Sequence, residues 1–204
     1  MKRPTIHMLL AAYTQGVFPM AHPEHDNEIY WYAPDPRAII DLDEFKTTRR
    51  LRQTVRQGVF EVRINTAFEE VIDACAAPRG EDEATWISSG IAKAYIDLHR
   101  AGFAHSVEAW KDGQLAGGLY GVSVGGLFAG ESMFHRVTDA SKVALVALVE
   151  RMKQQGMGLL DIQFMTDHLA RFGAKEIPKD AYEERLADAI EQRCTFAPRE
   201  SSHQ

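Results

Sequence analysis

The chain has 204 residues, of which 45% are hydrophobic and 25% charged, and its formal net charge is −6. The composition is typical of a globular protein with a sizeable core, and the negative charge argues against a protein that coats nucleic acid nonspecifically through many Lys and Arg contacts. No apolar run reaches the ~20 residues of a membrane helix, and Cys75 and Cys194 lack a CxxC spacing, so we expect a cytoplasmic protein with reduced thiols and no membrane contact.

Residues 1–43 are rich in turn formers and aromatic side chains, and we expect little regular structure there. Within them, Tyr32-Ala33-Pro34-Asp35-Pro36-Arg37 carries two prolines that hold the backbone extended or turned. This pattern predicts a stiff loop whose aromatic residues form a binding wall. Given the chain length, we expect a small N-terminal domain over 1–43 and a main domain over 44–204.

Residues 46–56 read as a helix with five basic side chains. At helical spacing Arg49, Arg52 and Arg56 share a face, which fits a phosphate backbone. An ordinary solvated helix face explains the same pattern equally well.

From residue 60 onward, short strand patterns alternate with helix patterns. We expect an extended piece at 60–63, helices at 67–76 and 88–100, strands at 105–111, 115–122 and 127–131, a helix at 141–155, a strand at 159–163, a short helix at 167–172, a strand at 174–177 and a last helix at 182–190. The hairpin signals Asp112-Gly113 and Gly125-Gly126 separate the three central strands and predict an antiparallel meander. This order favours an α+β fold over a doubly wound one.

Two motifs point to other enzyme classes. Gly121-Val122-Ser123-Val124-Gly125 matches GxSxG, and Asp161 and His168 follow in the order of a hydrolase triad. That elbow needs a strand running into a helix, whereas another glycine and a strand follow here, so we expect Ser123 in a hairpin. Residues 153–158 are similar to the pyrophosphate loop of CoA-dependent acetyltransferases, but they follow a helix instead of preceding one.

Two strands carry polar residues that need partners. Strand spacing puts Glu131 and Met133 on one face, so an acidic group and an apolar lining can meet in one pocket. The alternative is a strand-end Glu131 paired with Lys142. Asp161 and Gln163 share one side of the next strand. They either bond within the fold or await a polar ligand.

Many ordered segments together resemble the bacterial leucyl/phenylalanyl-tRNA–protein transferase family over nearly the whole chain. The matching segments include Gly16-Val17-Phe18-Pro19, Thr85-Trp86-Ile87, Gly117-Gly118-Leu119-Tyr120-Gly121-Val122, residues 128–134 and Asp161-Ile162-Gln163. The resemblance implies a small N-terminal domain before a GNAT-like (acyl-CoA N-acyltransferase-like) domain that uses aminoacyl-tRNA in place of acyl-CoA and needs no cofactor.

The same resemblance implies the activity and the partners. A monomer would move leucine or phenylalanine from Leu-tRNA or Phe-tRNA to acceptor proteins with N-terminal Arg or Lys, which marks them for N-end rule degradation. Some relatives with overlapping segments act on acidic N-termini, so the acceptor preference stays open. A CoA-dependent GNAT acetyltransferase and a noncatalytic tRNA-binding module remain as alternatives.

The resemblance also assigns roles to residues. Asp161 and Gln163 match the catalytic pair and would accept hydrogen bonds from the attacking amine. The substrate-binding residues would be Met20, Trp31, Tyr32, Trp86, Leu119, Phe128, Glu131, Met133, Leu145, Leu148 and Leu160. Met20 stands where the best-known members carry a tryptophan that holds the terminal adenosine, and its polarizable sulfur can still cover an aromatic face. Around the aminoacyl group the resemblance places Leu119, Met133, Leu145, Leu148 and Leu160. These side chains should admit Leu and Phe and reject β-branched Ile and Val, with a discrimination against Ile of about tenfold to two-hundredfold.

Overall fold

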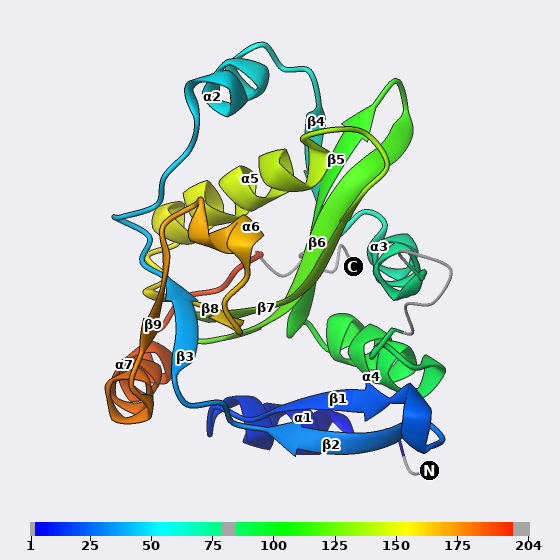
Figure 1. Ribbon diagram of the computed structural model, residues 1–204, viewed down its shortest axis with the longest axis vertical. Coiled ribbons are helices and arrows are strands. Elements are labelled where there is room, and N and C mark those ends of the chain that lie inside the picture. The colour runs from blue at the N-terminus through cyan, green and yellow to red at the C-terminus, as the bar shows by residue number, and fades with distance from the viewer. Residues whose placement is uncertain (1–2, 79–84, 198–204) are drawn as a thin grey trace, which may run out of the picture.

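The computed structural model describes residues 3–78 and 85–197, which are organised around a seven-stranded mixed sheet (Figure 1). In spatial order its strands are β4 (Glu61–Ile64), β5 (Ala104–Lys111), β6 (Gln114–Val124), β7 (Leu127–His135), β8 (Leu159–Gln163), β3 (Arg37–Ile40) and β9 (Ala174–Ile177). Neighbouring strands are antiparallel except β7 and β8, which are parallel. The α+β class expected from the sequence is therefore confirmed.

The N-terminal segment is more regular than we expected. It forms helix α1 (Ile6–Tyr13) and a hairpin of β1 (Phe18–His22) and β2 (Glu28–Tyr32), with a short 3-10 helix (Pro23–His25) between the two strands. Asp26 and Asn27 take left-handed backbone angles, φ 52° and 58°, and reverse the chain at the hairpin tip. The expectation of little regular structure was wrong because turn-forming residues are concentrated in this tip and in the loop before β3.

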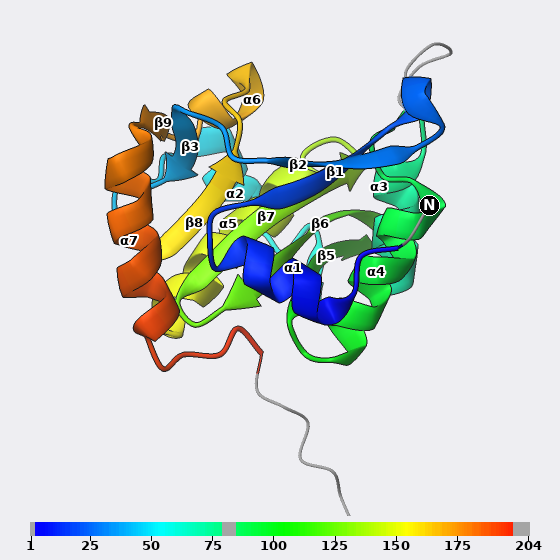
Figure 2. The same ribbon diagram turned by 90° about the horizontal axis from the view of Figure 1, so that it is seen from below.

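Helices cover both faces of the sheet. Helix α5 (Ala140–Gln154) packs on β5, β6 and β7 with most of its apolar side chains buried. The opposite face carries α1, α3 (Phe68–Ala76) and α4 (Ser89–Arg100), while α7 (Lys179–Glu191) lies beside β7 and β8 (Figures 1 and 2). Ser88 caps α4 by accepting a hydrogen bond from the Ile91 N–H.

The central meander of β5, β6 and β7 has the turns that the sequence predicted. Asp112 and Gly113 both have positive φ, 52° and 74°, as a two-residue hairpin turn requires. Ser123 lies inside β6 and no helix follows it, so the hydrolase elbow is not formed. Gly156 has φ 70° just after α5, and the chain then enters β8, so residues 153–158 end a helix and do not form a pyrophosphate loop.

Two further helices complete the described part of the chain. Helix α2 (Arg49–Arg56) begins at the capping residue Thr48, and α6 (Asp167–Ala170) follows β8. None of the helices within 3–78 and 85–197 is long and apolar enough to span a bilayer. Cys75 and Cys194 are free thiols.

Candidate functional site

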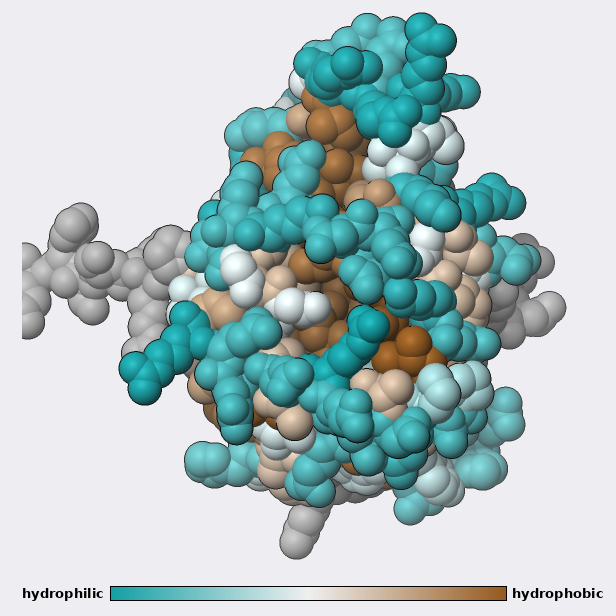
Figure 3. Space-filling view, turned by 90° about the vertical axis from the view of Figure 1, so that its left-hand side faces the viewer, coloured by the Kyte–Doolittle hydropathy of each residue, from teal (hydrophilic) through white to brown (hydrophobic). Residues whose placement is uncertain are grey.

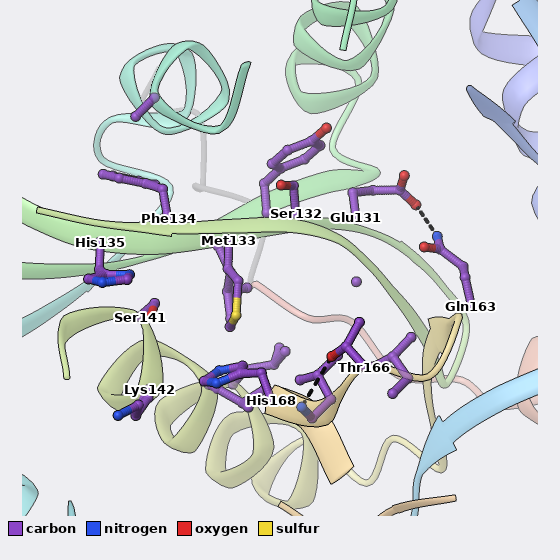
Figure 4. Close-up of a pocket in the computed structure, with 18 of the residues that line it drawn as sticks. Glu131, Ser132, Met133, Phe134, His135, Ser141, Lys142, Gln163, Thr166 and His168 are labelled. Atoms are coloured by element: carbon purple, nitrogen blue, oxygen red, sulfur yellow. Dashed lines mark hydrogen bonds between the residues drawn. The ribbon is translucent and has the colours of Figure 1, made fainter. Parts of the chain in front are cut away.

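A pocket opens where the two parallel strands of the sheet separate. Strand β7 pairs with β8 only from Leu127↔Leu159 to Ala129↔Asp161, although β7 continues to His135. The residues that follow on both strands line a cavity of about 920 Å³, with further walls from β1, α3, α5 and α6 (Figure 4). This volume is in the range of sites for small ligands.

One side of the pocket is apolar. The five side chains that we expected around an aminoacyl group all line it, and they come from β6, β7, β8 and α5: Leu119, Met133, Leu145, Leu148 and Leu160. Ile162 and Leu169, which the sequence did not single out, extend the same wall. The structure thus brings together an apolar compartment from segments that are far apart in the chain.

Glu131 supplies the acidic group of the pocket. It is the extra residue of a β-bulge, because Tyr120 pairs with Ser132 and Gly121 with Gly130. The bulge turns Glu131 away from Met133, so the expectation that both point to one face was wrong, although both line one pocket (Figure 4). Bulges often redirect a side chain beside an active site.

Three donors hold the Glu131 carboxylate. It accepts hydrogen bonds from the hydroxyls of Tyr13 (2.7 Å) and Tyr95 (3.0 Å) and from the side-chain amide of Gln163 (2.8 Å). Burial raises the pKa of Glu131 to about 7, and these donors partly offset that effect. The alternative partner Lys142 bonds instead to Asp139 (2.7 Å).

Gln163 lies at the mouth of the strand split with an unusual backbone. Its φ is 63°, in the left-handed region, and its N–H donates to Asp161 Oδ1 (2.9 Å). The side chain lines the pocket and donates to Glu131, while no described residue donates to its amide oxygen. An acceptor for an incoming amine therefore lies on the pocket wall.

Asp161, the residue expected to act together with Gln163, is buried in a network of hydrogen bonds. Its side chain is 1% exposed and is not among the described residues that line the pocket. It accepts two hydrogen bonds from Arg37 (2.9 and 2.7 Å), one from Tyr182 (2.8 Å) and one from the Gln163 backbone. These four donors occupy the carboxylate, whereas Gln163 and Glu131 line the pocket itself.

The remaining residues assigned to substrate binding divide into two groups. Met20 and Trp86 line the pocket together with Phe18. Trp31 and Tyr32, on β2, and Phe128 do not line it. Trp31 is 39% exposed beside Pro19, Tyr32 stacks on Phe18, and Phe128 is fully buried against Phe196.

Sequence reasoning missed Tyr13, Tyr95 and Arg37 as parts of the site. Tyr13 and Tyr95 are buried on helices α1 and α4. A tyrosine on the apolar face of a helix is a usable signal, because its hydroxyl needs a partner when the ring is buried. Arg37 gave no local signal, since its partner is 124 positions away.

The three arginines of α2 lie apart from this pocket. Arg49, Arg52 and Arg56 are exposed. Their helix α2 lies at the top of Figure 1, and the same end of the molecule is hydrophilic in Figure 3. Arg52 and Arg56 bond only to backbone carbonyls, of Thr47 and Arg52 respectively. Among the described residues none of the three has an ion-pair partner, so their charge is available to an anion.

Comparisons with known proteins give consistent results. The family model described as leucyl/phenylalanyl-tRNA protein transferase matches residues 39–187, and the model for the N-terminal domain of that family matches 3–35. Proteins named leucyl/phenylalanyl-tRNA–protein transferase are 53% identical in Herpetosiphon aurantiacus, covering 96% of this chain and 99% of the relative, and 53% identical in Gloeobacter violaceus, covering 94% and 97%. Among solved structures, that of L-PGS from Bacillus licheniformis aligns with a TM-score of 0.42 and 16% identity, covering 80% of this chain and 61% of the other.

Proposed function

Because this chain belongs to the leucyl/phenylalanyl-tRNA–protein transferase family, we propose that it transfers leucine or phenylalanine from aminoacyl-tRNA to the α-amine of proteins that begin with Arg or Lys. The observation that carries this proposal is a single pocket that combines an apolar compartment with a pair of polar side chains. Its apolar compartment is matched to an aliphatic or aromatic side chain, and the polar pair Glu131 and Gln163 lies beside it.

The reaction is aminolysis of an ester. The acceptor nitrogen attacks the carbonyl carbon, a C–N bond forms, the C–O bond to the ribose breaks, and the proton lost by the amine balances the one gained by the ribose oxygen. A free α-amine has a pKa near ~7.7–8.0, so about a tenth or more is unprotonated at pH 7 and no strong base is required. Positioning would supply most of the acceleration.

Two pocket residues can perform this positioning. The Gln163 amide oxygen would accept a hydrogen bond from the attacking amine, and the Glu131 carboxylate would stabilise the positive charge that develops on nitrogen. Of the expected pair, Gln163 would act directly at the pocket wall, and Asp161 would act through it by accepting the hydrogen bond from the Gln163 backbone N–H. Met20 and Trp86, backed by Phe18, would hold the terminal adenosine, while Trp31 and Tyr32 would support β1 from the second strand of the hairpin.

The proposal also covers the type of fold, the domain boundary and the cellular role of the protein. The split between parallel strands β7 and β8 is consistent with a GNAT-like main domain. A small N-terminal domain precedes it, and we place the boundary before β3 instead of at residue 43, because β3 pairs with β8 and β9 in the large sheet. We further propose that the enzyme acts as a cytoplasmic monomer in N-end rule degradation.

A transfer assay tests the function. Purified protein would be mixed with Leu-, Phe-, Ile- or Val-tRNA and with peptides that begin with Arg, Lys, Asp or Glu. We expect Leu and Phe to move to the Arg and Lys peptides, with Ile and Val slower by about tenfold to two-hundredfold, since one misplaced methyl costs ~1–3 kcal/mol. Acetyl transfer from acetyl-CoA to the same peptides would support the acetyltransferase alternative, and tRNA binding without transfer would support the noncatalytic one.

The pocket model is tested in the same assay with Met133→Ala. The shortened side chain widens the apolar compartment, so the preference for Leu over Ile should weaken in a variant that melts normally. Equal use of Leu- and Ile-tRNA by the wild type would refute the pocket model, and unchanged ratios in the variant would exclude Met133 from it.

A further inference from the structure

Arg37 is a buried arginine whose side chain is fixed on every side. It is 2% exposed, and its Nε and Nη2 groups donate to the two carboxylate oxygens of Asp161 at 2.9 and 2.7 Å. The remaining terminal nitrogen, Nη1, donates to the Gly16 carbonyl at 2.8 Å. The guanidinium also lies between two rings, 4.9 Å from the centroid of Phe18 and 4.5 Å from that of Tyr182. Arg37 and Asp161 therefore form a bidentate ion pair in which the position and the plane of the guanidinium are fixed.

The contacts of Arg37 reach the pocket in two directions. Through Asp161 they reach the Gln163 backbone N–H, and through Gly16 and Phe18 they reach the N-terminal segment, of which Phe18 itself lines the pocket. Gly16 has φ 73°, and a Cβ there would approach Tyr182 to 2.8 Å. The chain therefore uses glycine where the Gly16 carbonyl must lie close to Arg37 and Tyr182.

Gln163 needs such support. A non-glycine residue at φ 63° is strained and persists only where its surroundings fix it. The hydrogen bond from its N–H to Asp161 fixes this backbone, and the Gln163 side chain then meets Glu131 at 2.8 Å. On β8 the Asp161 carboxylate is the described side chain that bonds to the Gln163 backbone, in addition to the pairing of Gln163 with Ala38 of β3.

We propose that Arg37 is a positioning residue for transfer: by orienting the Asp161 carboxylate, with Tyr182 as the second donor, it holds Gln163 in the left-handed conformation that presents its amide to the acceptor amine. The proposal rests on the proposed function. A purely structural role explains less, because a buried ion pair is often no more stabilising than apolar residues of similar volume.

The test uses conservative variants that keep the core filled. Tyr182→Phe removes one donor to Asp161 and keeps the ring, while Arg37→Lys keeps the charge but cannot make the two-pronged bond and the Gly16 contact together. Arg151→Lys is the matched control, since Arg151 is partly buried on α5 and donates to the Phe196 carbonyl. We expect kcat to fall about tenfold to a hundredfold in the two test variants, with KM for Leu-tRNA and the melting temperature near wild type.

A double-mutant cycle with Gln163→Ala separates positioning from general stability. If Arg37 acts through Gln163, Arg37→Lys should cost little further kcat in the Gln163→Ala background. A full additive loss would overturn the proposal.

A crystal structure of Arg37→Lys gives a readout independent of activity. The Gln163 amide should have moved out of hydrogen-bonding distance of Glu131, and an unmoved Gln163 would overturn the proposal. A wild type without transfer activity would refute the proposed function and this role together, whereas an additive cycle in an active enzyme would refute only the role of Arg37.

Discussion

At the scale of single residues, the pocket places a carboxylate where its charge is costly. Glu131 is surrounded by the buried rings of Tyr13 and Tyr95, and burial raises its pKa from the ordinary 4.5 to about 7. The three donors are arranged for the ionised form but do not fully replace water. A carboxyl group with this pKa is ionised in about half of the molecules at neutral pH. Its charge can therefore change while an amine reacts beside it.

This cost predicts how the stability of the protein depends on pH. Between the unfolded and folded pKa values of Glu131 the folded state holds more protons, so stability falls as pH rises through this window. Relative to Glu131→Gln, the wild type should lose about 2 kcal/mol between pH 5.5 and 8. Urea unfolding of both proteins at the two pH values measures this difference.

The comparison of two proteins cancels the titration of all other groups. Glu176→Gln, at an exposed position on β9, is the control and should follow the wild type at both pH values. A Glu131→Gln variant that also tracks the wild type would mean that Glu131 is already ionised at pH 5.5.

At the scale of elements, periodicity predicted most of the main domain. The strands at 105–111 and 174–177 and the helices at 88–100 and 141–155 lie within one residue of β5, β9, α4 and α5. These elements carry their own signals in apolar spacing, caps and turn residues. Sequence pattern therefore predicts an element correctly where the element's own apolar spacing, caps and turn residues determine its conformation.

The same reasoning failed where long-range pairing decides the conformation. The bulge at Glu131 depends on the register between β6 and β7, and the left-handed Gln163 is hydrogen-bonded to Asp161, which accepts in turn from the distant Arg37. Neither is visible in strand alternation, which therefore misassigned the face of Glu131 and left the partners of Asp161 open. The β1–β2 hairpin was missed because Pro19 and the turn residues mask its alternation.

Helix α3 shows how one strand can stabilise the start of a helix. Its N-cap residue is Ala67, which has no side-chain acceptor, and fully buried Glu108 on β5 instead holds the two residues that lead into the helix, accepting from the N–H groups of Thr66 and Ala67, both at 2.9 Å. Glu108 also accepts from Ser106 (2.7 Å) and Trp110 (3.1 Å).

Removing this carboxylate should therefore be severe. Glu108→Ala leaves several buried donors without an acceptor, so we expect a loss of roughly 3 kcal/mol or more. That corresponds to a melting temperature lower by about 6–12 °C for a protein of this size. Calorimetry measures it, with Glu61→Ala as the exposed control that should shift by less than about 0.5 kcal/mol. A small shift for Glu108→Ala would show that water enters to satisfy these donors.

At the scale of the whole molecule, the polar network joins parts that the family models separate. Tyr13 and Gly16 belong to the segment matched by the N-terminal model, whereas Glu131 and Asp161 belong to the main one. The contacts Tyr13 to Glu131 and Arg37 to Gly16 connect them across the site. The N-terminal segment is therefore part of the pocket, and its contacts reach the same groups for which we propose a role in transfer.

The charge distribution of the whole molecule also matters, because a protein with net charge −6 is proposed to bind tRNA, a polyanion. Attraction must then be local, and the three exposed α2 arginines without ion-pair partners among the described residues are the best candidates. Replacing Arg49, Arg52 and Arg56 together with Ala should weaken tRNA binding and reduce the slope of log K against log salt by a little under one per lost phosphate contact. Binding titrations between about 50 and 200 mM salt measure this slope.

A matched triple variant separates contact from net charge. Arg3, Arg100 and Arg185 pair with Asp97, Glu69 and Asp41, so replacing them with Ala changes the net charge equally but removes cations that are already neutralised. If α2 contacts phosphate, the α2 variant should lose slope and this control should keep it, because counterion release counts only the phosphates that are contacted. Equal slopes in both variants and the wild type would return α2 to an ordinary solvated face, and equal losses in both would show that tRNA responds to total charge alone.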